Sequence, residues 1–339
     1  MDASNYEQRF QTICLFILST VAVAFALFWL RPVMLPFILA LFFTLVLTPL
    51  IDIQMKYVKM PRPLALIVTL TLGIVLLSIF VILVSASVNQ LAVNADSYQA
   101  QIQQMLDNVT TKLKLERFGV DAQSLLKPYI KDLGENVGGM VVRTINAIVK
   151  IFSQGTLVLI FMIFLLLGQS RKGQPPVSFW AESVGPIKRY IAAKVFFSAI
   201  TGILVGSILT ILGVDLALVF GLFAFLLNFI PSVGSIIATL LPLPVVLVSP
   251  ELSTLSIVLA IALPGAVQFT IGNVIEPKII GDSLKIHPVV ILMALIFWGM
   301  IWGIVGMLLA VPLTAMMKII FEKSDLTKPM ADLLSGGSS

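Results

Sequence analysis

The chain has 339 residues, of which 58% are hydrophobic and only 12% charged, and its formal net charge is +5. This charged fraction is about half that of an average soluble domain, so a water-soluble fold could not bury the apolar surface. The apolar residues also occur in runs of about 20, the length of helix that crosses the ~30 Å hydrocarbon core of a bilayer. The sequence therefore predicts an all-α polytopic membrane protein and excludes soluble enzymes and nucleic-acid-binding proteins.

The amino-terminal region, residues 1–86, contains three apolar runs that carry no charged residue. Each run is long enough to cross a bilayer as a helix. We predict that these first three membrane spans lie at Phe10–Leu30, Val33–Ile51 and Pro63–Ala86.

The connections between spans predict an orientation. Lys56, Lys59 and Arg62 lie between the second and third spans, and basic residues in short connections mark the cytoplasmic side. A second basic connection follows a fourth span, Ile145–Leu167, and together they form the region 145–190. We therefore expect the segment between the third and fourth spans to face outward.

Residues 87–144 differ from the rest of the chain because charged residues of both signs are frequent there. Leu91, Tyr98, Ile102 and Met105 follow a helical spacing and predict one apolar stripe on a long helix. The segment therefore predicts a small helical extramembrane subdomain on the extracytoplasmic side.

The carboxyl-terminal half contains a similar unit twice, at 191–248 and 249–321, before a tail at 322–339 that we expect in the cytoplasm. Each unit has one span and then an apolar run of about 30 residues, which as one helix would be ~45 to 50 Å long. Such a run must fold back within a bilayer. The predicted breaks are at Asn228, Pro231 and Gly234 in the first run and at Gly299, Gly303, Gly306 and Pro312 in the second.

This pattern predicts about eight membrane segments, including two broken or re-entrant hairpins in an inverted-repeat-like carboxyl-terminal half. Many secondary transporters use such repeats to build a substrate site near the middle of the membrane. A P-loop of the form GxxxxGK[ST] is absent from the sequence, so we do not expect ATP to drive the chain directly.

Four stretches of the sequence carry a resemblance to a known family. They are YIAAKVFFSAITG (190–202), FGLFAFLLNFIPSVGS (220–235), GNVIEPKIIG (272–281) and WGMIWGIVGMLLAVP (298–312). They resemble the AI-2E family of bacterial permease-like proteins, the autoinducer-2 exporters. The resemblance implies a transport protein of the bacterial inner membrane with both termini in the cytoplasm, assembled as a homo-oligomer, with a pentamer known in the family.

The resemblance leaves the cargo open. It implies export of a small polar solute such as autoinducer-2, or antiport of sodium or lithium against protons, and the motifs do not choose between them. A third alternative is a membrane scaffold without transport activity that acts through the subdomain at 87–144.

Glu276 is the first candidate residue for a transport pathway, because ionisable groups within a membrane are costly and usually functional. Asn273 lies three residues earlier, so the two side chains are expected on one helical face, and Pro277 follows. The pair would bind a cation or carry a proton. The alternative is a glutamate that meets water at the end of its helix.

A polar stripe that begins one residue before the fifth predicted span, Ile191–Gly213, supplies a second group of candidates. Tyr190, Lys194, Ser198 and Thr201 follow one another at spacings of four, four and three. Lys194 would pair with Glu276 or with an anionic substrate. The alternative is that its amino group extends to the cytoplasmic interface.

The hairpin break and one buried amide complete the pathway candidates. Asn228, Pro231 and Gly234 would free backbone groups that need partners, which favours a substrate gate over a purely structural tip. Gln268 lies in the middle of a span, where an amide either bonds to a neighbouring helix or contacts a ligand.

Other residues have structural interpretations. Gly202 with Gly206, and Gly299 with Gly303, form GxxxG spacings that allow close helix packing. His287, the only histidine, is expected to cap the helix that begins at Pro288. Cys14 is the only cysteine, so a disulfide within the chain and a Cys-ligated metal cluster are excluded. We also expect no metal site, no cofactor and no enzymatic activity. The expected partners are a small polar solute or a monovalent cation with a proton, and the lipid bilayer, with no nucleic acid.

Overall fold

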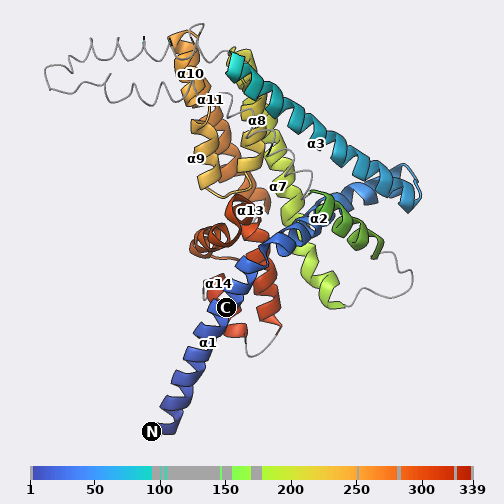
Figure 1. The fold of residues 1–339 in the computed structure, drawn as a ribbon, viewed down its shortest axis with the longest axis vertical. Coiled ribbons are helices and arrows are strands. Elements are labelled where there is room, and N and C mark those ends of the chain that lie inside the picture. Colours follow the sequence, from blue (N-terminus) through green and yellow to red (C-terminus); the bar gives the residue numbers. More distant parts are fainter. Residues whose placement is uncertain are drawn as a thin grey trace, which may run out of the picture. The chain divides into compact units, whose positions relative to one another are not determined.

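The structure is a computed structural model that describes residues 3–93, 155–168, 178–249, 252–280, 284–323 and 327–336, together with residues 100, 104 and 146 (Figure 1). Within these residues the regular elements are helices, and no strand is present. Most of the subdomain predicted at 87–144, and with it the scaffold alternative, lies outside the described residues.

Helices cover the predicted spans where the structure describes them, and of the fourth predicted span, 145–167, it describes residues 146 and 155–167. The helices are α1 (Ala3–Trp29), α2 (Arg31–Tyr57), α3 (Arg62–Val93), an unlabelled helix (Gly155–Gly168), α7 (Ser178–Ile211), α8 (Ala217–Leu227), α9 (Val233–Leu240), α10 (Leu243–Val248), α11 (Thr254–Phe269), the π-helix η2 (Thr270–Ile275), α12 (Glu276–Ile280), α13 (Pro288–Glu322) and α14 (Lys328–Ser335).

Six segments in the described part of the chain are long and apolar enough to cross a membrane. They are Phe10–Trp29, Arg31–Tyr57, Arg62–Gln90, Gly185–Ile211, Thr254–Ile279 and Pro288–Glu322. Shorter apolar helices lie at Gly155–Gly168, Ala217–Leu227 and Val233–Val248. The predicted class, an all-α polytopic membrane protein, is confirmed.

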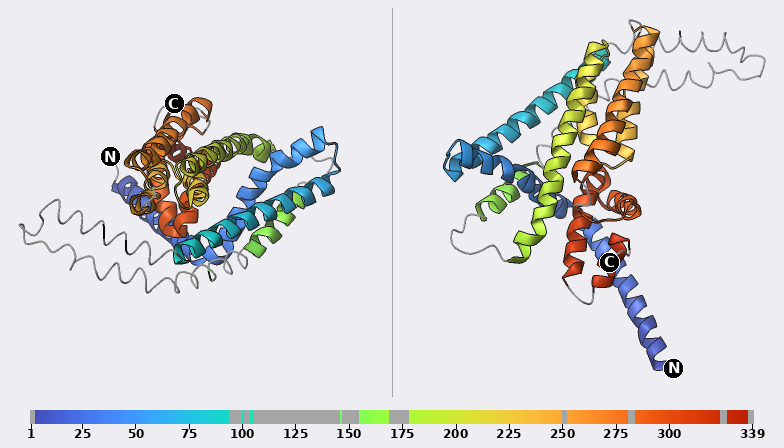
Figure 2. Two further views of the ribbon diagram at one scale, coloured as in Figure 1. Left: turned by 90° about the horizontal axis from the view of Figure 1, so that it is seen from above. Right: turned by 180° about the vertical axis from the view of Figure 1, so that it is seen from behind.

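The chain forms two compact units. Unit 1 consists of Met1–Val46, Gln154–Lys188 and Leu284–Ser339, and unit 2 consists of Leu47–Ser153 and Arg189–Ser283. Figure 2 gives two further views of the same helices. The division of the sequence into six successive regions stays a prediction. Each compact unit combines segments that lie far apart in the sequence, so the two units do not correspond to those regions.

Unit 2 has a hydrophobic core shared by α7, α8, α9, α10 and α11. Small and branched side chains fill it, which lets the short helices of the predicted first hairpin pack closely. Its buried members are Val205, Leu209, Val214, Ala217, Phe220, Ala224, Ala238, Val246 and Ala260.

The first long apolar run, 216–248, folds back as predicted. α8 and α9 contact each other across a turn at 228–232, and the backbone of Ser232 has φ 59° there. Gly234 then packs against the carbonyl of Leu227, in a space that a Cβ could not share. We call this segment hairpin 1.

The second long run folds back inside α13 at Gly303, whose φ of 66° and ψ of −145° are not helical. Trp298 Nε1 donates to Thr314 Oγ1 at 3.3 Å, although 16 residues of continuous helix would separate them by about 24 Å. Gly306 packs against the carbonyl of Trp298. We call the segment 288–322 hairpin 2.

Two details of hairpin 2 correct the sequence analysis. Pro312 does not break the run, because it lies buried within the helical returning arm. Gly299 and Gly303 do not form a packing pair on one continuous helix, since Gly303 is the turn itself. Gly299 instead faces Met307 of the returning arm, whose Cε would lie 2.8 Å from an added Cβ.

The start of hairpin 2 is fixed by a cap. His287 Nδ1 accepts a hydrogen bond from the backbone N–H of Val289 at 3.3 Å, so the predicted capping role is confirmed. The N–H of His287 donates to the carbonyl of Leu334 in α14. At the turn, Trp302 Nε1 donates to the carbonyl of Leu27 in α1. All of these contacts lie in unit 1.

Candidate functional site

α7 and α8 of unit 2 approach closely through glycine. A Cβ on Gly202 would lie 2.7 Å from the carbonyl oxygen of Gly221, and Gly206 also lies beside Gly221. The absence of side chains therefore allows the backbones to touch. The two helices run antiparallel, so this register brings Asn228, at the end of α8, to Ser198 on α7.

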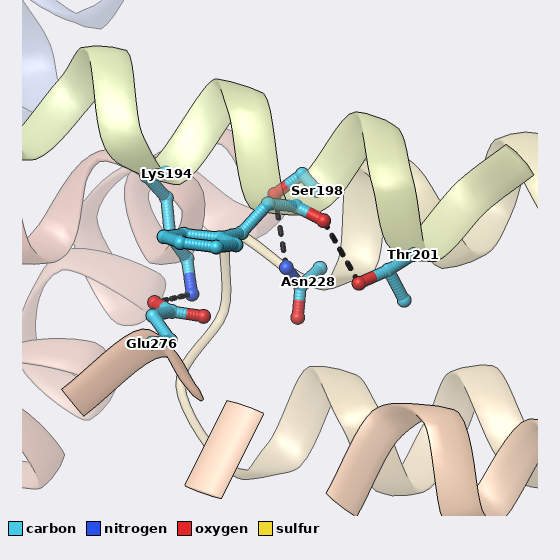
Figure 3. Close-up of polar contacts among 6 residues, drawn as sticks. Lys194, Ser198, Thr201, Asn228 and Glu276 are labelled. Carbon is cyan, nitrogen blue, oxygen red and sulfur yellow. Dashed lines mark hydrogen bonds and ion pairs between the residues drawn. The ribbon is translucent and has the colours of Figure 1, made fainter. Parts of the chain in front are cut away.

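The predicted polar stripe on α7 faces the interior of unit 2 (Figure 3). Lys194, Ser198 and Thr201 are buried, while Tyr190 at the start of the stripe is half-buried. Asn228 Nδ2 donates to Ser198 Oγ at 3.0 Å, and the hydroxyl of Thr201 donates to a backbone carbonyl one turn earlier. The stripe thus continues onto the end of α8 as a buried row of polar groups.

Lys194 and Glu276 form a buried ion pair. Lys194 Nζ lies 2.5 Å from Glu276 Oε1, and the two residues are only 5% and 9% exposed. An isolated charge would be costly at such depth, so each group needs the other. Of the sequence alternatives, the structure therefore shows pairing with Glu276 and not an exposed amino group.

The second carboxylate oxygen of this pair remains unused. Glu276 Oε2 is buried and has no hydrogen-bond partner among the described residues. A buried acceptor without a partner is unusual in native structures. The site can therefore accept a proton or a cation at this oxygen without first breaking the contact to Lys194.

The π-helix η2 leads directly into Glu276 and changes which residues share its face. A π-helix has wider turns than an α-helix, so each residue advances less around the axis. As a result Asn273 is exposed while Glu276 is buried. The expectation of one shared polar face fails, and a pathway role for Asn273 stays a prediction.

Gln268 on α11 is 3% exposed, and neither Nε2 nor Oε1 has a hydrogen-bond partner among the described residues. The bond to a neighbouring helix that the sequence suggested is therefore not formed there. An unsatisfied amide buried among apolar helices costs about 1–3 kcal/mol.

The register of α7 places Lys194 at the turn of hairpin 1. Towards the amino-terminal end of α7, Gly206 lies beside Gly221 and Ser198 contacts Asn228. Lys194 lies one helical turn before Ser198. One further turn of α7 therefore reaches the level of the residues that follow Asn228, where Pro231 forms part of the turn.

The contacts of α9 on the other side of hairpin 1 place Glu276 at the level of the same turn. α9 and α11 contact each other and run antiparallel, since a Cβ on Gly265 would lie 3.4 Å from Thr239 and one on Gly272 would lie 3.8 Å from Ser235. Glu276 follows Gly272 by one turn. The ion pair therefore lies at the level of the turn that joins the two arms of hairpin 1.

Two polar residues on α9 were not singled out from the sequence. Ser235 and Thr239 lie four residues apart on an otherwise apolar helix, and Thr239 donates to the carbonyl of Ser235 at 2.9 Å. Thr239 lies beside Gly265 of α11, and Ser235 lies beside Gly272 of η2.

No group of three or more His, Cys, Asp or Glu side chains that could hold a metal ion occurs among the described residues. The polar groups of the site are instead one ion pair and several amides and hydroxyls within apolar helices. This combination, together with two hairpins, defines a polytopic membrane protein whose interior carries charge.

The comparison with known proteins assigns the chain to a family. The chain belongs to the AI-2E family of transporters, whose family model matches residues 15–325. The AI-2 transport protein TqsA of Escherichia coli is 31% identical over 316 residues, 89% of each chain. A "Putative transport protein" of Haemophilus influenzae is 28% identical over 89% of this chain and 90% of its own. The chain is therefore a multi-pass membrane protein of a bacterial transporter family.

Proposed function

We propose that the chain is a secondary transporter that exports a small polar solute, of the autoinducer-2 type, across the bacterial inner membrane. The name of the Escherichia coli relative supports the cargo, and the buried polar row of unit 2 supports the route. The proposal includes cytoplasmic termini and a homo-oligomeric assembly. It also includes coupling of flux to an ion gradient.

The observation that carries the proposal is the buried Lys194–Glu276 pair at the turn of hairpin 1. One partner comes from α7 and the other from the helix that follows η2. The pair therefore ties together the two helices that flank the hairpin. Breaking it would free the turn and the polar row around Ser198 and Asn228.

The chemistry of the pair suggests how an ion would open it. A proton on Glu276, or a cation at its free Oε2, removes the negative charge that holds Lys194. Lys194 then lacks a counterion in an apolar environment and must move towards water or towards the solute. Ion binding and solute access would be coupled through this one contact.

The test is solute flux in liposomes that contain the purified full-length chain. Glu276→Gln retains size and hydrogen bonding but removes the titratable charge, so we expect flux to lose its dependence on a proton or sodium gradient. Lys194→Met with Glu276→Gln removes the pair without leaving an isolated charge. Gradient-dependent flux equal to that of the wild type in both variants would contradict the proposal.

A matched control is available in hairpin 2. Lys318 Nζ lies 3.2 Å from Glu322 Oε1, and the Glu322 side chain is 48% exposed. Glu322→Gln removes a similar lysine–glutamate contact where water can replace it. We expect gradient-dependent flux to be unchanged in this variant.

A second candidate function is antiport of a monovalent cation against protons through Glu276. The free Oε2 favours it, because a carboxylate oxygen is the hard ligand that such cations prefer. Exchange of labelled sodium for protons without any added solute would distinguish it from solute export. Glu276→Gln should abolish that exchange.

A further inference from the structure

The junction between α1 and α2 lies at the turn of hairpin 2, within unit 1. Leu30 alone separates the two helices, and Arg31 is the first residue of α2. Trp302 Nε1 donates to the carbonyl of Leu27 at 3.2 Å, which holds the last turn of α1 beside the turn of hairpin 2. The junction and the turn therefore form one continuous surface.

The Arg31 guanidinium lies against this turn. Its Nη2 would be 3.7 Å from a Cβ on Gly303, and apart from the backbone around Gly303 it is the only heavy atom of the described chain within 4 Å of that position. Arg31 is exposed, and no hydrogen bond or ion pair joins its guanidinium to another described residue. A guanidinium has five N–H donors, so this surface presents a positive charge with hydrogen-bond donors at the turn.

The position of Arg31 in the sequence sets its depth in a membrane. It is the only charged residue between Phe10 and Ile51, a stretch that contains the first two predicted spans. The apolar helix Phe10–Trp29 is 20 residues long, or about 30 Å, which matches the hydrocarbon core of a bilayer. The ends of such a helix lie at the two surfaces of the bilayer. The guanidinium therefore lies at the level of the lipid headgroups.

Exposed apolar side chains flank both the junction and the turn. Trp29 and Val33, on either side of the arginine in the chain, are 75% and 58% exposed. Met300 and Ile304, close to the turn residue in the chain, are 77% and 68% exposed. Tryptophan is frequent at the membrane interface, and aliphatic side chains match the hydrocarbon of acyl chains. A cation within such a surface fits a molecule that has both an anionic group and hydrocarbon chains.

The charges of the surrounding elements select the headgroup of that molecule. Neither the stretch from Phe10 to Ile51 nor hairpin 2 before Glu322 contains a carboxylate, so these segments supply no counter-charge at the junction. A guanidinium forms two parallel hydrogen bonds with phosphate oxygens. One phosphodiester carries one negative charge and neutralises one guanidinium, whereas a zwitterionic headgroup would bring a second cation beside it.

We propose that Arg31 and the exposed apolar side chains around it bind an anionic phospholipid with one phosphodiester, of the phosphatidylglycerol type, at the turn of hairpin 2. The guanidinium binds the phosphate, and the acyl chains lie along the apolar side chains. The bound lipid connects the α1–α2 junction with the turn and stabilises both. The site is independent of the proposed export function, since none of its residues belongs to the polar row of unit 2.

The test is binding of dioleoylphosphatidylglycerol to the purified full-length chain, measured by native mass spectrometry in a neutral detergent. Arg31→Gln removes the charge and the paired hydrogen bonds, so we expect binding of the first lipid to weaken about tenfold or more. Arg31→Lys retains the charge without the paired geometry and should weaken binding severalfold. It also keeps the proposal testable if Arg31→Gln is not inserted correctly.

Lys59→Gln is the matched control. Lys59 is also basic and exposed, but it lies in the connection that follows the other end of α2. The variant lowers the net charge of the chain by the same amount as Arg31→Gln, and we expect the affinity of the wild type. Added lipid should raise the unfolding midpoint of the wild type and of this control, but not that of Arg31→Gln. Equal losses of affinity in the two variants would overturn the site, because they would show attraction to total charge.

Two competing ligands separate the alternative occupants. Dioleoylphosphatidylcholine tests the charge of the headgroup, and glycerophosphoglycerol, the headgroup without acyl chains, tests the hydrocarbon. We expect neither to displace dioleoylphosphatidylglycerol at equal concentration. Equal displacement by dioleoylphosphatidylcholine overturns the anionic class, and equal displacement by glycerophosphoglycerol overturns a lipid in favour of a soluble phosphodiester. The same spectra count subunits, so a loss of subunits in Arg31→Gln with unchanged lipid binding would assign the surface to a second copy of the chain and overturn the lipid site.

Discussion

The two hairpins reverse the chain with the same backbone arrangement. Each turns at a residue with positive φ, Ser232 in hairpin 1 and Gly303 in hairpin 2. Each then has a glycine that packs against a carbonyl of the incoming arm, Gly234 in the first and Gly306 in the second. Sharp reversal within an apolar run thus requires one unusual backbone conformation and one position without a side chain.

The side chains that secure the two turns differ in kind. Hairpin 1 is held by the Asn228 amide and has a buried ion pair at its turn, whereas hairpin 2 is held by the indole N–H groups of Trp298 and Trp302. Indoles bury a large apolar surface and cannot titrate. Under the proposed function, hairpin 1 would respond to ions through Glu276, whereas the indoles that secure hairpin 2 do not change charge.

The largest expected effect tests whether charge secures hairpin 1. Lys194→Met leaves the Glu276 carboxylate buried without a partner and should cost about 3–5 kcal/mol of stability. Adding Glu276→Gln should recover most of that loss. The measurement is thermal unfolding of the purified chain by intrinsic fluorescence.

The ion pair of Lys318 and Glu322 in hairpin 2 serves as the control. Lys318 also donates to the carbonyl of Leu284, but its partner Glu322 is half-exposed. Removing Glu322 should therefore cost at most about 1 kcal/mol. Equal losses for the two ion pairs would remove the distinction between the hairpins.

The second prediction tests the packed glycine that follows the turn in both hairpins. Gly234→Ala and Gly306→Ala each place a Cβ against a backbone carbonyl that cannot move aside, and each should cost about 3 kcal/mol. Gly73→Ala is the control, because nothing lies within 4 Å of its Cβ position in α3. It should be neutral or stabilising by up to about 1 kcal/mol. The measurement is thermal unfolding. Destabilisation of only one of the two hairpin variants would contradict a backbone arrangement common to both hairpins.

Much of this fold follows from hydropathy and breaking residues. The spans were predictable because an uncharged run of fixed length has few alternatives in a bilayer. Both hairpins were predictable because their runs exceed the membrane thickness. The position of each turn was less certain: Pro312 resembles a breaker in sequence, yet its helix continues, and Gly303 alone reverses the chain.

The site was predictable only where an α-helical period holds. The stripe from Lys194 to Thr201 lies on a regular helix, so its members are buried together as expected. The prediction for Asn273 fails because η2 changes the rotation per residue, and the spacing of polar residues in the sequence does not reveal a π-helix. The unpaired state of Gln268 depends on which groups the neighbouring helices present to it, which is a tertiary property.

The third prediction compares the two turn residues. Gly303 has a φ and ψ that side chains rarely adopt, so Gly303→Ala should cost about 1–3 kcal/mol. Ser232 already carries such strain at φ 59° and ψ −56°, so Ser232→Gly should stabilise the chain by about 1 kcal/mol. The opposite signs would be read from shifts in the thermal unfolding midpoint. A loss of stability in Ser232→Gly would show that the hydroxyl contributes more than the strain costs.

The smallest effect on stability gives the sharpest distinction in function. Asn228→Leu removes the amide that donates to Ser198, and Thr314→Val removes the hydroxyl that accepts from Trp298. Each variant loses hydrogen bonding in one hairpin at similar volume, so each should cost about 1 kcal/mol. Solute flux in liposomes should nevertheless fall severalfold in Asn228→Leu and stay unchanged in Thr314→Val, because only hairpin 1 presents its polar groups to the row that leads to the ion pair. Equal losses of flux at equal losses of stability would mean that both hairpins act as structural elements, and the transport route would then have to be sought away from Asn228.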